Sequence, residues 1–144
     1  MVNICIGIGI KSRRINGILY DLEGNIIYEG EFFENIPKEG KNLNLYEING
    51  KLKYKGDIFE FKYEGKSILY EEDTIKYVGE FKKGMFHGYG KLYKNKYIDK
   101  SRDENNYYLD FEGNFVMGNC EGNGIKYYIT GEKIYEGLFK NNKI

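Results

Sequence analysis

One short pattern occurs five times in this chain and constrains its fold more than any other feature. An aromatic residue, any residue, glycine, any residue and a large apolar residue follow one another at 28–32, 54–58, 77–81, 111–115 and 135–139. The central glycines are separated by 23 to 34 residues. Repeats at such intervals are typical of proteins in which one small structural unit stacks on the next. The sequence therefore predicts a stacked-repeat architecture.

The pattern has the two-residue period of a β-strand. In the first copy, Tyr28, Gly30 and Phe32 would lie on one face and Glu29 and Glu31 on the other. The chain contains no alanine, glutamine or tryptophan but 15 tyrosines and 9 phenylalanines. Such a composition disfavours helices and favours strands.

A second element precedes the aromatic–glycine strand in each unit. Residues 17–30 align without gaps to 124–137, and 43–56 align in the same way, with a tyrosine and a glycine in register. The aligned glycines, Gly24, Gly50 and Gly131, provide the positive φ that tight hairpin turns require. Each unit is therefore predicted to be a β-hairpin.

The downstream half of the unit is clearest after Gly79, where the chain reads Gly84-Met-Phe-His87-Gly88-Tyr-Gly90. The whole unit, Tyr-x-Gly-Glu-Phe-Lys-x-Gly-x-x-His-Gly-x-Gly, resembles the MORN (membrane occupation and recognition nexus) repeat. The resemblance extends roughly from Gly17 to the C-terminus and is nearly complete over 77–90. It implies an elongated, twisted single sheet of antiparallel hairpins, one for each repeat.

Pattern and resemblance together predict an all-β fold, an elongated single-layer antiparallel sheet of stacked β-hairpins. We expect one MORN-repeat domain over 1–144, with repeat motifs near 28–32, 54–58, 77–90, 111–124 and 135–139. Ile4, Ile6, Ile8 and Ile10 alternate with smaller or polar residues, which predicts an irregular N-terminal strand within 1–16. A polar inserted loop is expected at about 94–106, where the interval between motif glycines is longest.

The repeated glycines have a physical explanation. Because no second sheet would cover the aromatic face, we expect rings from neighbouring strands to pack over the bare backbone of glycine. The aromatic residues of this surface are Tyr28, Phe32, Tyr54, Tyr77, Phe81, Phe111, Phe115, Tyr135 and Phe139. The structural glycines are Gly30, Gly56, Gly79, Gly88, Gly90, Gly113, Gly122, Gly124 and Gly137. The interpretation is structural, with the alternative that some rings also line a binding groove.

Charge and cysteine content limit the classes of partner. Lys+Arg and Asp+Glu are both 22, so the chain lacks the basic excess of nucleic-acid binders and of proteins that bind anionic membranes. Two widely separated cysteines, Cys5 and Cys120, indicate free thiols in a reducing compartment, so we expect a cytoplasmic protein. The N-terminal apolar run has no basic residue before it and is too short to span a membrane.

No constellation of catalytic or metal-ligating residues emerges from the sequence. The single histidine, His87, has no cysteine nearby to complete a metal site and no evident partner as a general base. We therefore expect neither enzymatic activity nor a cofactor.

The MORN resemblance implies a non-catalytic protein-interaction or scaffolding module, here expected to be a stand-alone bacterial protein. An alternative is an antitoxin or immunity protein that binds a toxin. A further alternative is lipid-headgroup binding, which the zero net charge disfavours. The fifth repeat ends shortly after Phe139 without its return strand. We therefore predict an open C-terminal edge that permits a homodimer or strand addition by a partner.

Overall fold

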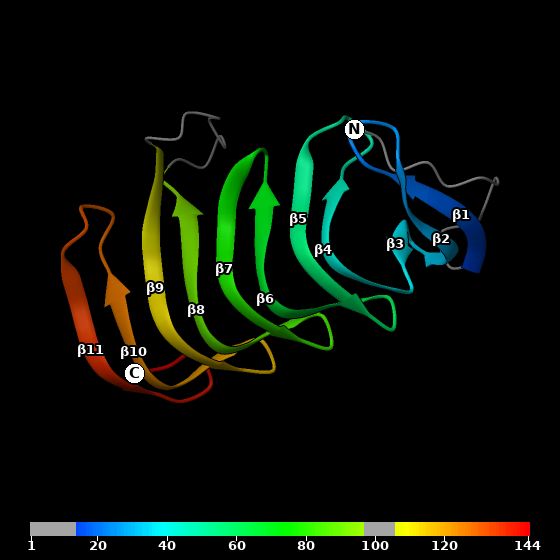
Figure 1. The fold of residues 1–144 in the computed structure, drawn as a ribbon. Coiled ribbons are helices and arrows are strands. Elements are labelled where there is room, and N and C mark those ends of the chain that lie inside the picture. Colours follow the sequence, from blue (N-terminus) through cyan, green and yellow to red (C-terminus); the bar gives the residue numbers. More distant parts are fainter. Residues whose placement is uncertain (1–13, 97–105) are drawn as a thin grey trace.

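The computed structural model describes residues 14–96 and 106–144, and these form an all-β fold (Figure 1). The predicted strand within 1–16 lies outside the described residues except for its last three positions, which begin β1. The inserted loop is shorter than predicted at its start, because residues 94 and 95 belong to β8, and residues 97–105 lie outside the described part. The strands are β1 (Arg14–Tyr20), β2 (Ile26–Phe33), β3 (Ile36–Pro37), β4 (Glu39–Tyr46), β5 (Leu52–Phe59), β6 (Lys62–Glu71), β7 (Thr74–Lys82), β8 (Met85–Asn95), β9 (Tyr107–Val116), β10 (Asn119–Tyr127) and β11 (Lys133–Phe139).

The strands are antiparallel, and each pairs with its neighbours in sequence except that β3 does not pair with β4. Eight strands, from β4 to β11, make one continuous sheet, and β1, β2 and β3 make a separate smaller one. The predicted single-layer sheet of stacked hairpins is confirmed. The interruption of the hydrogen-bonded ladder between β3 and β4 was not expected.

Every hairpin carries a β-bulge at the same place, directly before its motif aromatic. In the third hairpin, Leu69 pairs with Tyr77 and Tyr70 pairs with Ile75, which leaves Lys76 as the extra residue. A bulge of this kind shifts the side-chain alternation by one residue. Tyr70 follows Leu69, the partner of Tyr77, and so faces the opposite side, and the bulge brings Ile75 to the same side as Tyr70. The extra residues in the five hairpins are Ile27, Lys53, Lys76, Asp110 and Ile134.

The core lies on one face of the sheet, which we call the inner face. Tyr77 and Phe81, four residues apart on β7, have ring centroids 5.0 Å apart, and Tyr77 stacks on Phe86 of β8 at 3.9 Å. Four residues of straight strand span about 13 Å, so the rings lie much closer together than their Cα atoms would in a straight strand. Figure 1 shows that the strands also curve.

The turns that follow β7, β9 and β11 are each hydrogen-bonded to the preceding repeat. The amide of Lys83 donates to the carboxylate of Glu64, and the next amide, of Gly84, donates to the carbonyl of Tyr63. The following turn repeats this arrangement: Met117 donates to Nδ1 of His87, and the Gly118 amide donates to the Phe86 carbonyl. In the last turn the acceptors are the Glu121 carboxylate and the Cys120 carbonyl. The repeated His or Glu position therefore joins successive repeats.

Phe61 joins the two sheets. It lies in the turn between β5 and β6 with φ of 63°, a left-handed conformation that is rare for a bulky side chain. Its ring contacts Phe33 of β2 at 6.2 Å, and the guanidinium of Arg14 lies 4.9 Å from its centroid. The Phe61 amide donates to the carbonyl of Lys38, next to the break between the sheets.

Candidate interaction surfaces

The motif aromatic and glycine form one local unit. The ring of Tyr77 leans along its own strand over Gly79, so that a Cβ added to Gly79 would lie 2.7 Å from the tyrosine hydroxyl. The hydroxyl donates a hydrogen bond to the carbonyl of Glu80, 2.9 Å away. Tyr28, Tyr54 and Tyr135 make the equivalent bond in their repeats. We had expected a ring from a neighbouring strand over this glycine, but the ring belongs to the same strand.

The same ring also covers the following strand, where a small residue is required. A Cβ added to Gly90 of β8 would lie 2.2 Å from the Tyr77 hydroxyl, and one added to Gly124 of β10 would lie 2.4 Å from the ring of Phe111. At this position β6 carries a serine, Ser67. The expectation that rings lie over glycines of a neighbouring strand therefore holds for Gly90 and Gly124.

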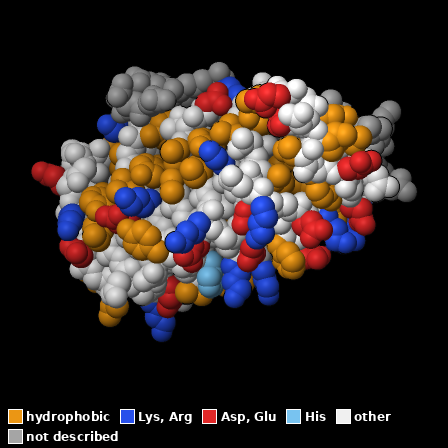
Figure 2. Space-filling view, in the orientation of Figure 1, with side chains coloured by type: hydrophobic (Ala, Val, Ile, Leu, Met, Phe, Trp, Pro, Cys, Tyr) orange, Lys and Arg blue, Asp and Glu red, His pale blue; other side chains and the backbone are white. Residues whose placement is uncertain are grey.

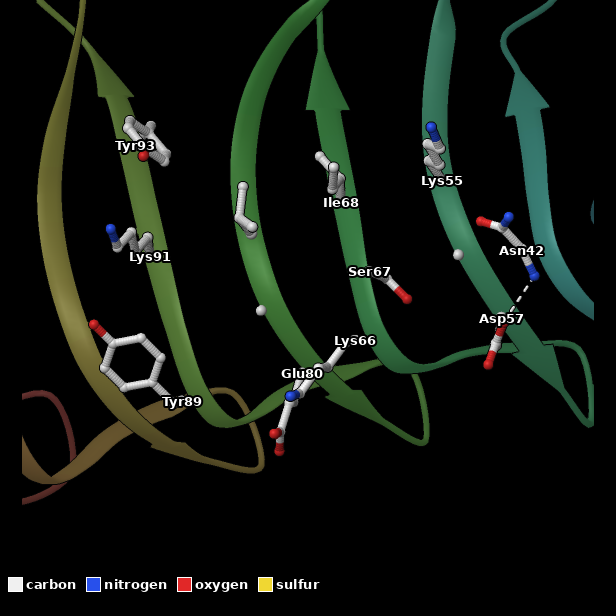
Figure 3. Close-up of a pocket in the computed structure, with 13 residues that line it drawn as sticks. Asn42, Lys55, Asp57, Lys66, Ser67, Ile68, Glu80, Tyr89, Lys91 and Tyr93 are labelled. Atoms are coloured by element: carbon white, nitrogen blue, oxygen red, sulfur yellow. Dashed lines mark hydrogen bonds between the residues drawn. The ribbon is translucent and has the colours of Figure 1, made fainter.

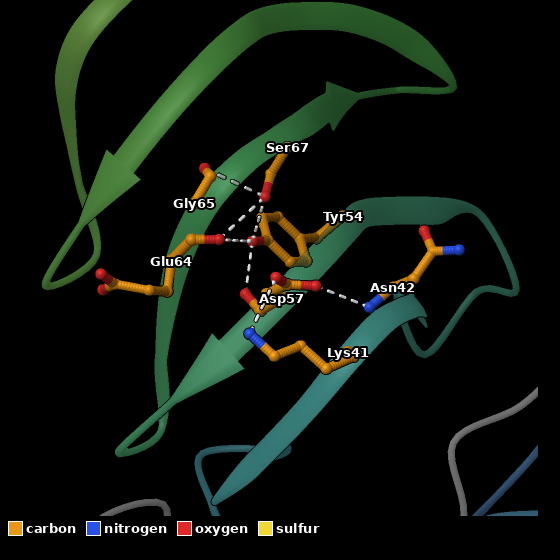
Figure 4. Close-up of polar contacts among 7 residues, drawn as sticks. All are labelled: Lys41, Asn42, Tyr54, Asp57, Glu64, Gly65 and Ser67. Carbon is orange, nitrogen blue, oxygen red and sulfur yellow. Dashed lines mark hydrogen bonds and ion pairs between the residues drawn. The ribbon is translucent and has the colours of Figure 1, made fainter.

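Ser67 replaces glycine by joining a hydrogen-bonded cluster (Figure 4). Its Oγ lies 2.7 Å from the hydroxyl of Tyr54, for which it is an acceptor, and donates to the carbonyl of Glu64, 3.1 Å away. The Tyr54 hydroxyl lies 2.6 Å from the carbonyl oxygen of Asp57, to which it donates. Burial raises the pKa of Tyr54 to about 12 and also raises the pKa of Tyr63, stacked against it, to about 12.

The break between the two sheets falls where the spacing of the repeat changes. The small residue follows its motif glycine by 11 positions in three repeats, as at Gly79 and Gly90, whereas Leu43, which pairs with Gly56, follows Gly30 by 13. The backbone amide of Lys38 donates to the Tyr28 hydroxyl at 3.2 Å. Strand β4, which follows directly, begins the eight-stranded sheet.

The predicted aromatic residues are core residues. Phe32, Tyr54 and Tyr77 have no exposed surface, and the four phenylalanines at 81, 111, 115 and 139 are at most 6% exposed. Tyr28 and Tyr135, in the first and last repeats, are half-buried. Burial of this extent leaves these rings little surface for a partner.

The opposite, outer face of the eight-stranded sheet carries a row of tyrosines that our sequence reasoning did not single out as a surface. Tyr46, Tyr70, Tyr93 and Tyr127 each follow the residue that pairs with the motif aromatic, and all four are half-buried. Strands about 4.8 Å apart place successive tyrosines about 9.6 Å apart. The sequence signal was the tyrosine that recurs in register in the aligned units.

A shallow depression of about 630 Å³ lies below this row. Figure 3 shows Tyr89, Lys91 and Tyr93 on β8 and Ile68 on β6, with β7 between these two strands. Three lysines line the depression together with two carboxylates, so its charge is mixed. They are Lys55, Lys66, Lys91, Asp57 and Glu80. In the view of Figure 2, further charged side chains gather along the lower edge, where the hairpin turns lie in Figure 1.

Glu112 organises the outer face next to this depression. Its carboxylate accepts hydrogen bonds from Tyr127 and from Tyr89, the latter at 3.1 Å, and Lys91 lies 3.7 Å away. The hydrogen bond from Tyr127 is the main cause that lowers the pKa of Glu112, and the same bond raises the pKa of Tyr127 to about 12. The outer face is thus held by a charge-assisted network rather than by close packing.

The C-terminal edge is a second open surface. Strand β11 is the last strand of the sheet and pairs with β10 alone among the described residues. Leu138 and Ile134 on this strand are 67% and 42% exposed. Lys140 and Lys143 form a single bridge in the turn that follows.

The described ranges contain neither a cluster of metal ligands nor a membrane-spanning helix. In 14–96 and 106–144, no three His, Cys, Asp or Glu residues are arranged to hold a metal ion. No helix in these ranges is long and apolar enough to cross a membrane.

Comparison with known proteins agrees with the repeat assignment. The MORN repeat family model matches residues 77–96 and 111–133. No curated protein matches the chain. The two matched segments begin at the motif aromatics Tyr77 and Phe111, whose rings cover the glycines of the following strands. In these two segments the MORN repeat match and the hairpin geometry agree.

Proposed function

We propose that this protein is a non-catalytic interaction module that binds a protein partner on the outer face of its eight-stranded sheet. The observation that carries the proposal is the difference in exposure between the two faces of the sheet. The aromatic rings of the inner face are buried in the core, while the tyrosine row and the depression at Ile68, Lys91 and Tyr93 remain accessible. Tyrosines are common at protein interfaces because they combine apolar area with a hydrogen-bonding group.

The composition of this face favours a protein over a nucleic acid or a membrane. Lysines and carboxylates alternate on it, and Lys91 pairs with Glu112, so there is no continuous basic surface for phosphates. A toxin is one class of protein partner, and an antitoxin would be the corresponding form of this function. The thiol of Cys120 is free, which suits the cytoplasmic location that we propose.

The test begins with affinity capture from the native source and reconstitution with the purified partner. We expect Tyr70→Ser combined with Tyr93→Ser to weaken binding at least tenfold, with an unchanged circular dichroism spectrum. Ile48→Ser, at a fully exposed turn residue, is the control and should bind normally. Unchanged affinity of the tyrosine variant would refute the outer-face site. The captured protein's identity distinguishes a toxin from a scaffold component.

The open edge of β11 also permits a homodimer, in line with the exposed Leu138. Sedimentation at high micromolar concentration measures this directly. A mass that stays monomeric would exclude the homodimer and leave the outer-face proposal untouched.

A further inference from the structure

The junctions between successive repeats show what a strand must carry to pair beside a motif ring. In three junctions the following strand has Ser67, Gly90 or Gly124 next to the ring, and the sheet continues. A Cβ added to Gly90 would lie 2.2 Å from the Tyr77 hydroxyl, and one added to Gly124 would lie 2.4 Å from the Phe111 ring. The three continuing junctions therefore share the requirement for a small residue beside the ring.

Tyr135 on the terminal strand is already in the conformation that the other motif tyrosines adopt. Its hydroxyl donates to the carbonyl of Leu138 at 3.1 Å, as Tyr77 donates to Glu80 at 2.9 Å. A Cβ added to Gly137 would lie 2.6 Å from this hydroxyl. The flank of Tyr135 that faces the next strand in other repeats has no strand against it among the described residues. Its geometry is therefore preset for an additional strand.

The β11 edge carries an exposed apolar side chain at a position where the other repeats have a polar one, as is expected of an interface. The residue after the motif glycine is polar in the other four repeats and is Leu138 in the last. Leu138 is 67% exposed, and an apolar residue at this degree of exposure on an open strand edge favours association. The internal counterparts are Glu31, Asp57, Glu80 and Asn114.

We propose that the β11 edge is a selective docking site for an antiparallel strand of a partner protein that carries glycine or serine opposite Gly137. The register follows that of Gly113 with Gly124, and the Tyr135 ring closes over the partner's small residue. A large side chain at that position is rejected, because even a Cβ added to Gly90 or Gly124 would overlap the ring that covers it. This inference rests on the proposed role as an interaction module and specifies a second contact.

A second copy's own β11 is the less suitable occupant. In an antiparallel pair with Gly137 opposite Gly137, both Tyr135 rings would lean over the same two glycines from opposite ends. The internal junctions place only one ring over each such pair, as Tyr77 does over Gly79 and Gly90. The edge therefore favours a strand that carries the small residue without a competing ring.

A peptide with the sequence of Met85–Asn95 is a direct probe, because this segment, β8, already pairs beside the Tyr77 ring. The labelled peptide is titrated with the full chain, and binding is followed by fluorescence anisotropy. We expect saturable binding of this peptide and of its Gly90→Ser form, and at least tenfold weaker binding of its Gly90→Leu form. Tyr135→Ala in the protein should abolish the discrimination.

A tethered version removes the dependence on peptide affinity. The sequence of residues 82–95 replaces 140–144, so that the added strand follows Phe139 through a short turn. The glycine form should melt at a higher temperature than the leucine form. Equal melting temperatures, equal binding of the glycine and leucine peptides, or a β11-mediated dimer that excludes the peptide would each overturn the proposal.

The two proposals fail separately. Loss of peptide discrimination, with partner binding still sensitive to Tyr70→Ser and Tyr93→Ser, overturns only the edge site. Insensitivity of the partner to these tyrosines, with peptide discrimination intact, overturns only the outer-face site.

Discussion

Replacing Gly90 with alanine tests the packing of ring over glycine more directly than any other change. Gly90 is not among the residues with positive φ, so the substitution adds a methyl group without backbone strain. The added Cβ would lie 2.2 Å from the Tyr77 hydroxyl and 2.4 Å from Cζ of the same ring. The ring cannot move without disturbing its stack on Phe86 at 3.9 Å and its hydrogen bond to the carbonyl of Glu80.

The expected loss of stability combines two effects. Overpacking a buried site costs about 1–3 kcal/mol. Losing the tyrosine hydrogen bond costs about 0.5–1.5 kcal/mol more if the ring swings away. Because the ring can relieve the overlap by giving up the hydrogen bond, we expect a total of about 2–4 kcal/mol. Urea denaturation followed by circular dichroism measures this difference.

A double-mutant cycle with Tyr77→Ala supplies the control. Without the Tyr77 ring, the added methyl group at position 90 no longer overlaps it. The loss in free energy of unfolding caused by Gly90→Ala should then fall below about 1 kcal/mol, because alanine suits a strand better than glycine. The same cost in both backgrounds would refute the steric explanation. A cost below about 1 kcal/mol in the wild-type background would refute it as well.

Three further predictions concern the turns, the sheet junction and pH. His87→Glu should keep native stability, because Glu64 accepts the equivalent turn hydrogen bond, whereas His87→Leu should cost about 0.5–1.5 kcal/mol in urea unfolding. Phe61→Asn should relieve the turn but release the smaller sheet, which hydrogen exchange would detect as faster exchange in β1 and β2 with β7 to β10 unchanged. Tyr54 and Tyr63 have raised pKa values of about 12, so the unfolded state ionises first. Stability should be full below pH 10 and fall between pH 10 and 12, by up to about 1.4 kcal/mol per pH unit for each tyrosine. Tyr63→Phe should reduce this alkaline loss, and equal loss in that variant would contradict the assignment.

The capping role of His87 shows why a lone histidine in a repeat need not indicate chemistry. Its Nδ1 accepts from the Met117 amide at 3.4 Å, and Glu121 supplies the carboxylate equivalent in the next turn. The shared requirement is a hydrogen-bond acceptor that reaches the next repeat. The expectation that His87 takes no part in catalysis stays a prediction. In the structure this residue accepts the hydrogen bond that joins its repeat to the next turn.

The sequence by itself determined the repeat, the hairpins and the identity of the core rings. These follow from local rules: the two-residue period of strands, the glycines in turns, and the recurrence of one pattern in which Tyr77 and Gly79 stand two residues apart. Such features depend on neighbours in the chain, so spacing alone reveals them.

Only the tertiary structure decided how the side chains are placed at each bulge and where the sheet stops. The bulge at Lys76 shifts the alternation of β7 by one residue, so Ile75 lies with Tyr70 on the outer face, whereas strict alternation from Tyr77 would place Ile75 on the inner face. The ladder is interrupted between β3 and β4. The Tyr77 ring leans over Gly90 of the next strand, and contacts of this kind join residues through space, so spacing along the chain does not reveal them.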